Sequence, residues 1–160
     1  MYKIVMLSAG LLLGLILARL FFFVMKVETG SMNPNLREGD RILVSRLASV
    51  GKGDIVAVES PVDQGKLILS RIIAQEFETV EIRNRVVYIN DTVADFRWNT
   101  LKDGGTIYPM KFTFRDNMPP VKLGKNEFFL LGDNFDSSYD SRVLGVVPEK
   151  LIEGRIIYKR

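Results

Sequence analysis

The stretch Leu67-Ile68-Leu69-Ser70-Arg71-Ile72-Ile73 decides the fold class of this 160-residue chain, because it is an apolar run of strand length. Short runs of β-branched and aromatic residues between Gly, Pro, Asn or Asp predict β-strands. Further runs of this kind lie at residues 41–44, 54–58, 79–82, 86–89, 127–131 and 155–158. Their regular spacing predicts a mainly β domain, a barrel or folded sheet, over residues 27–160.

Helical periodicity is weak after residue 26, although we expect one helical turn at residues 147–152 with Pro148 near its start. Asn90-Asp91 predicts a hairpin turn, which leads into the less regular segment 92–126. This segment holds the large side chains Phe96, Trp98, Tyr108, Met110, Phe112 and Phe114. We interpret them as a small satellite core. The alternative is an aromatic surface that rests on lipid headgroups.

Residues 4–25 are almost wholly apolar and carry Arg19 as their one charged side chain. As a helix they would reach roughly 33 Å, enough to cross a bilayer core of ~30 Å. A cleavable signal peptide would need a small-x-small cleavage site after the apolar run, and Phe21-Phe22-Phe23-Val24-Met25-Lys26 offers none. The sequence therefore predicts an uncleaved transmembrane anchor over residues 1–26, followed by the β domain.

The formal net charge of +3 belongs to the N-terminal segment. Lys3, Arg19 and Lys26 are three of the 22 basic residues, and residues 1–26 contain no acidic residue. The other 19 basic residues are balanced by 19 acidic residues in the remainder of the chain. We therefore expect a lipid bilayer as a partner and no nucleic acid, because no excess of positive charge is left to bind phosphates.

The chain contains neither histidine nor cysteine. The missing histidine excludes Ser-His-Asp catalysis and imidazole ligation of a metal. The missing cysteine excludes disulfides and thiol chemistry. We therefore expect no metal and no cofactor, and any catalysis has to use hydroxyl, amine, carboxylate or backbone groups.

Two polar motifs, far apart in the sequence, carry the chemistry. The first is Gly30-Ser31-Met32-Asn33-Pro34, in which Gly30 permits close approach of a substrate backbone and Pro34 stiffens the turn. The second is Gly132-Asp133-Asn134-Phe135-Asp136-Ser137-Ser138-Tyr139-Asp140-Ser141-Arg142. A serine hydroxyl becomes a useful nucleophile when a base removes its proton and donors stabilise the oxyanion. Ser31 is the candidate nucleophile.

With the apolar N-terminus and the turn Gly53-Asp54-Ile55-Val56, these motifs resemble those of the bacterial type I signal peptidases. That family consists of membrane-anchored serine endopeptidases with a Ser/Lys dyad. The resemblance implies one transmembrane helix followed by a β-sheet domain of the signal peptidase type. It implies Ser31 as nucleophile, with the Thr29 hydroxyl and the Ser31 N–H as oxyanion donors. Supporting roles, namely orientation of the base and an ion pair that holds the loop, are implied for Ser138, Asp140 and Arg142.

Position 70 departs from the family pattern. The family places its lysine base in a strand that reads Lys-Arg-Val-Ile-Gly, and this chain has Ser70-Arg71-Ile72-Ile73-Ala74 there. Ser70 thus occupies the general-base position, but a serine hydroxyl cannot take the proton from Ser31. Lys66 lies on the same face of the strand, with its Cα roughly 13 Å from that of Ser70 at ~3.3 Å per residue. The sequence leaves open whether Lys66 replaces the missing base.

Two functions remain. The first is a membrane hydrolase, a serine protease of the signal peptidase I type. It would process signal peptides during protein export by cutting preproteins after a small-x-small motif, with the substrate paired as a strand near residues 25–31 and 67–70. The alternative is an impaired or inactive homologue that binds signal peptides or a membrane partner. The resemblance implies a single-pass protein of the cytoplasmic membrane with its catalytic domain on the outer face.

Overall fold

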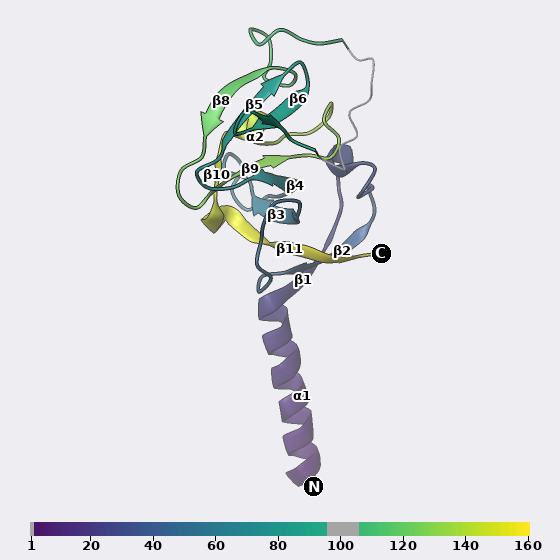
Figure 1. Cartoon of the computed structure of the whole chain (residues 1–160). Coiled ribbons are helices and arrows are strands. Elements are labelled where there is room, and N and C mark those ends of the chain that lie inside the picture. Colours follow the sequence, from purple (N-terminus) through teal and green to yellow (C-terminus); the bar gives the residue numbers. More distant parts are fainter. Residues whose placement is uncertain (1, 96–105) are drawn as a thin grey trace.

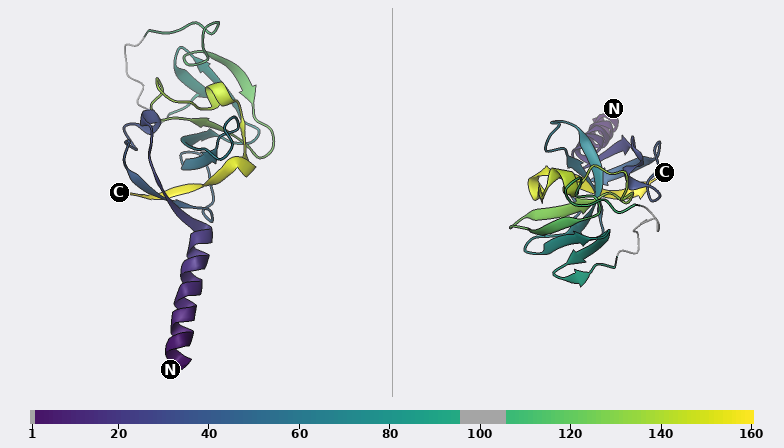
Figure 2. Two further views of the ribbon diagram at one scale, coloured as in Figure 1. Left: turned by 180° about the vertical axis from the view of Figure 1, so that it is seen from behind. Right: turned by 90° about the horizontal axis from the view of Figure 1, so that it is seen from above.

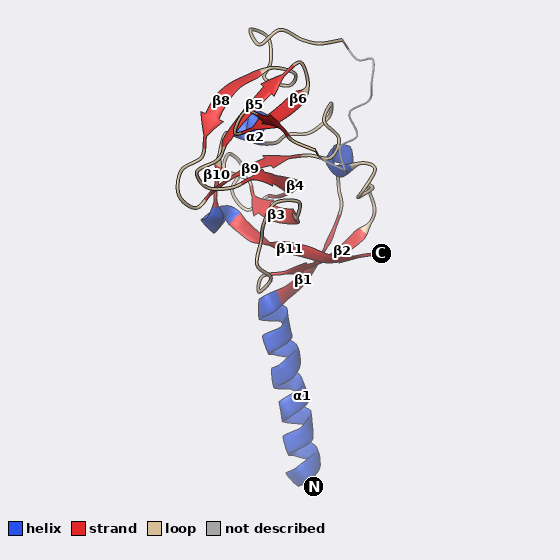
Figure 3. Cartoon of the chain, in the orientation of Figure 1, coloured by secondary structure: helices blue, strands red, loops and turns tan. Residues whose placement is uncertain are grey.

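The computed structural model describes residues 2–95 and 106–160. Its elements are, in chain order, α1 (Tyr2–Phe21), β1 (Phe22–Lys26), η1 (Gly30–Met32), β2 (Arg41–Ser45), β3 (Ile55–Glu59), β4 (Leu67–Ala74), β5 (Thr79–Arg83), β6 (Val86–Ile89), β7 (Thr92–Val93), β8 (Met118–Lys122), β9 (Glu127–Leu131), α2 (Ser141–Leu144), β10 (Val147–Pro148), η2 (Glu149–Leu151) and β11 (Ile152–Lys159). Figure 3 shows one long helix, α1, joined to a domain of strands, short helical turns and loops.

The described strands form two antiparallel sheets. The larger sheet has the order β1-β2-β11-β3-β4-β9-β10, and the smaller one has the order β7-β6-β5-β8. The smaller sheet lies above the larger one in Figure 1, while α1 projects from the opposite end of the domain. The view from behind in Figure 2 shows the same arrangement, with α1 and the smaller sheet at opposite ends. The β domain therefore has one end at α1 and another at the smaller sheet.

Strand β4 lies at the centre of the hydrophobic core. Leu69, Ile72 and Ile73 each belong to a different cluster of buried apolar side chains. A strand that is covered on both faces has to be apolar at successive positions and cannot alternate between apolar and polar residues. This burial explains why residues 67–69 and 72–74 are apolar, and it places Ser70 inside the domain.

The predicted strand runs are confirmed as β2, β3, β4, β5, β6, β9 and β11, with some shifted ends. The expected turn at residues 147–152 is divided between β10, η2 and the start of β11. Strand β8 was not predicted, because it contains Pro119 and Pro120, which have no backbone N–H to donate to a neighbouring strand. It is nevertheless accommodated, since β8 is an edge strand of the smaller sheet.

Helix α1 ends earlier than the predicted anchor, because Phe22–Lys26 form β1 and pair with β2. Arg46 accounts for this end: its N–H donates to the Phe21 carbonyl at 2.8 Å, and its guanidinium to the Leu20 carbonyl at 3.4 Å. These bonds satisfy carbonyls that a helix end leaves free. The β domain thus begins at residue 22 and not at residue 27.

A helix that is both long enough and apolar enough to cross a membrane is not found within the described part of the chain. The predicted transmembrane anchor over residues 1–26 is therefore not supported by the structure.

The aromatic segment after β7 does not form the predicted satellite core. Tyr108, Met110, Phe112 and Phe114 are all exposed, so that interpretation is wrong for these residues. Phe96 and Trp98 lie outside the described residues. The described part of this loop lies beside the smaller sheet, at the end of the domain opposite α1 (Figure 1).

Candidate active site

Ser31 lies in the short 3-10 helix η1, which follows the edge strand β1. Its Oγ is 3.0 Å from Oγ1 of Thr29, so the two hydroxyls share a hydrogen bond. Asn134 holds the turn from the other motif. Its backbone N–H donates to the Ser31 carbonyl at 2.9 Å, and its side-chain amide donates to the Gly30 carbonyl at 3.1 Å. The two motifs of the sequence therefore meet at Ser31.

Gly132 separates Ser138 from the Ser31 backbone and leaves no room for a side chain. A Cβ at this position would lie 2.3 Å from the Ser138 Cβ and 2.7 Å from the Ser31 carbonyl oxygen. Both distances are far shorter than the ~3.5–4.0 Å of an ordinary contact between carbon atoms. The glycine thus permits the close approach of the two serine-bearing segments.

We expect Gly132→Ala to destabilise the fold by about 1–3 kcal/mol or more, because the new methyl group overpacks the site. It should also move Ser138 away from Ser31. Gly51→Ala is the matched control, since a Cβ at Gly51 meets no atom within 4 Å. Denaturant unfolding of the full chain measures both variants. Equal unfolding free energies for Gly132→Ala and Gly51→Ala would contradict the close approach.

The half-buried Ser138 and the buried Asp140 and Arg142 form a hydrogen-bonded cluster. The Ser138 hydroxyl donates to Asp140 Oδ2 at 2.7 Å and accepts from Arg142 Nη2 at 2.8 Å. The expected ion pair between Asp140 and Arg142 is present, with Nη2 and Oδ2 2.7 Å apart. Asp140 also accepts the N–H of Gly132 at 3.0 Å. The ion pair thus orients Ser138 and ties it to the glycine beside Ser31.

Ser70 lies within β4 and is 1% exposed. It is the register partner of Val56 in β3. On the other side of β4, Arg71 is the partner of Leu131 in β9, and Gly132 directly follows Leu131 in the chain. Position 70 is therefore near the end of β9, where the second motif begins. It carries a hydroxyl where the resemblance implies an amine.

Arg71 and Asp133 form a buried ion pair that the sequence reasoning missed. The guanidinium donates to both carboxylate oxygens of Asp133, at 2.7 and 2.6 Å, and to the Gly53 carbonyl at 2.6 Å. Asn35 donates to the same carboxylate at 2.8 Å. A cation inside an apolar strand requires an anionic partner. Arg71 within the apolar run was therefore the signal in the sequence that such a partner exists. The pair joins β4 to the second motif.

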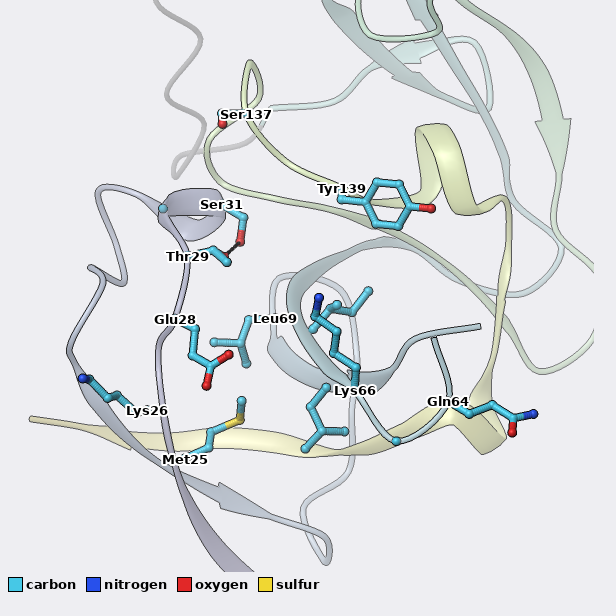
Figure 4. Close-up of a pocket in the computed structure, with 14 residues that line it drawn as sticks. Met25, Lys26, Glu28, Thr29, Ser31, Gln64, Lys66, Leu69, Ser137 and Tyr139 are labelled. Carbon is cyan, nitrogen blue, oxygen red and sulfur yellow. Dashed lines mark hydrogen bonds between the residues drawn. The ribbon is translucent and has the colours of Figure 1, made fainter. Parts of the chain in front are cut away.

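A cavity of about 880 Å³ opens beside Ser31 and is lined by residues from segments 25–31 and 64–69 and from the loop at Ser137 and Tyr139 (Figure 4). Lys66 lines the same cavity, but its side chain is 62% exposed and its amine lies 3.8 Å from the Asp63 carboxylate. Across residues 2–95 and 106–160, no cluster of acidic side chains has the arrangement of a metal site.

Comparison with known proteins identifies the family. The model of the signal peptidase family, peptidase S26, matches residues 1–159. Signal peptidase I V of Bacillus subtilis is 33% identical over 84% of this chain and 83% of that protein. A probable signal peptidase I-1 of Synechocystis is 29% identical over 93% of this chain and 78% of that protein. The crystal structure of a signal peptidase I from Enterococcus faecalis matches with a TM-score of 0.54 and 25% identity, covering 69% of this chain and 98% of the other.

The structure combines a mainly β fold with a serine turn beside a cavity. The matches then decide the family, and the chain belongs to the signal peptidases, peptidase S26. The family resemblance that the sequence motifs indicated is therefore confirmed. The similarity to the solved signal peptidase I also confirms the mainly β fold.

Proposed function

We propose that this chain is a serine endopeptidase of the signal peptidase I type, which cuts exported preproteins after a small-x-small motif. The observation that carries the proposal is the Ser31 hydroxyl, 3.0 Å from the Thr29 hydroxyl beside a cavity large enough for an extended peptide. In the proposed reaction the Ser31 oxygen attacks the scissile carbonyl and its proton passes to water in the open cavity. The C–N bond then breaks, the new N-terminus leaves as an amine, and water hydrolyses the ester on Ser31. The Thr29 hydroxyl and the Ser31 N–H stabilise the oxyanion.

The strand pairing supports an extended substrate between segments 25–31 and 67–70. Residues 67–71 of β4 pair with β3 on one side, whereas the described pairing with β9 begins at Arg71. The backbone of residues 67–70 therefore has one edge available beside the cavity. Strand β1 pairs with β2 and ends the sheet, so its continuation towards Ser31 offers a second edge.

The second candidate function is binding of signal peptides without turnover. Ser70 favours it, because a buried serine stands where the reaction requires a base. The Ser138 hydroxyl is likewise engaged by Asp140 and Arg142. In this case the cavity beside Ser31 would hold a peptide, and the Ser31 hydroxyl would keep its proton.

Binding of a labelled signal peptide with alanine at the −1 and −3 positions tests both functions, because both require a peptide in the cavity beside Ser31. The chain should bind this peptide, and a tryptophan at −1 should weaken binding by ~10-fold or more, because a shallow pocket excludes a large side chain. Fluorescence anisotropy measures the two affinities. Equal affinities would contradict the small-x-small preference. Mass spectrometry of the same samples separates turnover from binding.

We also propose that residues 1–26 attach the chain to the cytoplasmic membrane, with the β domain on the outer face. The apolar sequence of residues 4–25 supports this, as do the exposed apolar side chains of Val5, Leu7, Leu11, Leu12, Ile16 and Leu20. After alkaline carbonate washing, the chain should remain in the membrane pellet with Met1-Tyr2-Lys3 or Tyr2-Lys3 at its N-terminus.

Leu11→Asp combined with Leu12→Asp should release the chain into the supernatant, because charged groups are costly in a bilayer. The control is Leu47→Asp, an equally exposed position of the β domain, which should leave the chain in the pellet. A soluble product that begins after residue 20 would rule out an uncleaved attachment.

A further inference from the structure

Arg85 is buried although it stands in a hairpin turn. Asn84 and Arg85 link β5 to β6, with φ of 49° and 71°. The Arg85 N–H donates to the Asp116 carbonyl at 2.8 Å, which fastens the turn to the segment before β8. The Arg85 side chain is 9% exposed, whereas arginine is mostly exposed in proteins. A buried cation requires compensating partners.

The Arg85 side chain contacts the second polar motif, residues 132–142. Its Nη2 lies 2.7 Å from Asp136 Oδ1, and its guanidinium carbon lies 5.6 Å from the centre of the Phe135 ring. Its Nη1 lies 3.6 Å from Asp116 Oδ1. The two terminal nitrogens are buried and make no hydrogen bond of good geometry. Charge and ring contacts therefore hold Arg85 against residues 135 and 136.

Asp116 provides a fixed negative charge beside Arg85. Its side chain is fully buried and accepts hydrogen bonds from the Arg115 guanidinium at 2.8 and 2.6 Å and from the Tyr108 N–H at 2.8 Å. Burial raises the pKa of Asp116, but the hydrogen bonds from Arg115 and Tyr108 outweigh burial and hold this pKa below its ordinary value. The ionised carboxylate favours a cation at Arg85.

Arg142 holds the same part of the motif. Its guanidinium carbon lies 4.1 Å from the centre of the Phe135 ring, and its Nη1 donates to the Phe135 carbonyl at 2.7 Å. The same guanidinium donates to Ser138. Two arginines therefore lie against the Phe135 ring, Arg142 from the second motif and Arg85 from the β5–β6 turn of the smaller sheet. A shift of Phe135 would disturb the group that orients Ser138.

We propose that Arg85 is a positioning residue of the active site. It braces Phe135 and Asp136 against the β5–β6 turn and, through Arg142, keeps Ser138 beside the Ser31 segment. The smaller sheet thereby fixes the geometry of the loop at residues 132–142. The kinetic consequence rests on the proposed peptidase function, whereas the effect on loop order is independent of it.

The test compares Arg85→Met with Arg83→Met, a control in the same hairpin whose exposed side chain pairs with Glu81. Both are made in the full chain and in the Ser70→Lys background. Amide hydrogen exchange of Gly132 and Asn134 should be ~10-fold faster in Arg85→Met and unchanged in Arg83→Met. In the Ser70→Lys background, kcat should fall by ~10- to 100-fold with KM almost unchanged, because the displacement affects orientation and not binding.

Asp136→Asn is the second variant, because Asp136 is partly exposed and its loss endangers folding less. It should accelerate exchange at the same two amides. Unchanged exchange at Gly132 and Asn134 in both variants overturns the proposal, as does faster exchange spread evenly over the whole domain. If the Ser70→Lys background cleaves nothing, the peptidase function fails, while the exchange data still decide the role of Arg85.

Discussion

Ser70→Lys is expected to accelerate preprotein cleavage on the order of 10⁴- to 10⁶-fold over the chain with Ser70, because a nucleophile and its base act as a unit. Position 70 is suited to the change. Its neighbours Leu69 and Ile72 are buried, and a poorly hydrated site favours the neutral, basic form of an amine. Leu131 pairs with Arg71, and Gly132, the next residue, lies against Ser138, which we expect to orient that amine.

The measurement uses three versions of the full chain with one preprotein: the chain with Ser70, Ser70→Lys, and Ser70→Lys combined with Ser31→Ala. The last version is the control and should return cleavage to the background rate. Residual cleavage by the unchanged chain is expected to be slow, supported by the oxyanion donors alone. Full activity of the unchanged chain that disappears with Lys66→Ala would overturn this expectation and make Lys66 the base. Equal inactivity of all three versions would favour the binding function.

Arg71→Met is expected to cost about 3–5 kcal/mol of unfolding free energy, since it leaves one partner of a buried ion pair behind. The Asp133 side chain is 1% exposed, and in the intact protein Arg71 donates to both of its carboxylate oxygens. The variant removes the Arg71 cation from that buried charge, while the hydrogen bond from the Asn35 amide stays. The loop that carries Asn134 should loosen as well, which would release the Ser31 turn.

Denaturant unfolding of the full chain measures this loss. Arg83→Met removes an exposed arginine beside Glu81 and should leave the unfolding midpoint unchanged. Arg71→Met combined with Asp133→Leu should recover part of the loss, because an apolar pair does not leave a buried charge. Similar midpoints for Arg71→Met and Arg83→Met would show that the buried pair does not hold the loop.

The strands of the β domain could be predicted because their cause is local. A strand buried on both faces, such as β4, is apolar at most of its positions, and this pattern is visible without knowledge of its neighbours. Strand β8 could not be predicted, because Pro119 and Pro120 are compatible with a strand at a sheet edge alone. Edge position is a property of the assembled sheet.

The exposure of the segment after β7 could not be predicted either, because it also depends on the assembled fold. Tyr108 and Phe112 are large side chains of the kind found in cores. They would be buried only if another apolar surface covered them, and both remain exposed. The boundary at residue 22 is a second case. Phe22 continues an apolar run, and its place in a strand follows from pairing with Ser45 of β2.

The sequence by itself indicated the family, which the comparisons confirm. Ser31 in its glycine turn and Ser70, where the resemblance implies the base, are identities of single residues, and no folding is required to recognise them. Only the tertiary structure decided which groups hold these serines. The pairing of Arg71 with Asp133 and the brace at Arg85 join residues that are distant in the chain. Side-chain pairing depends on distance and burial in three dimensions, and a one-dimensional pattern does not contain either quantity.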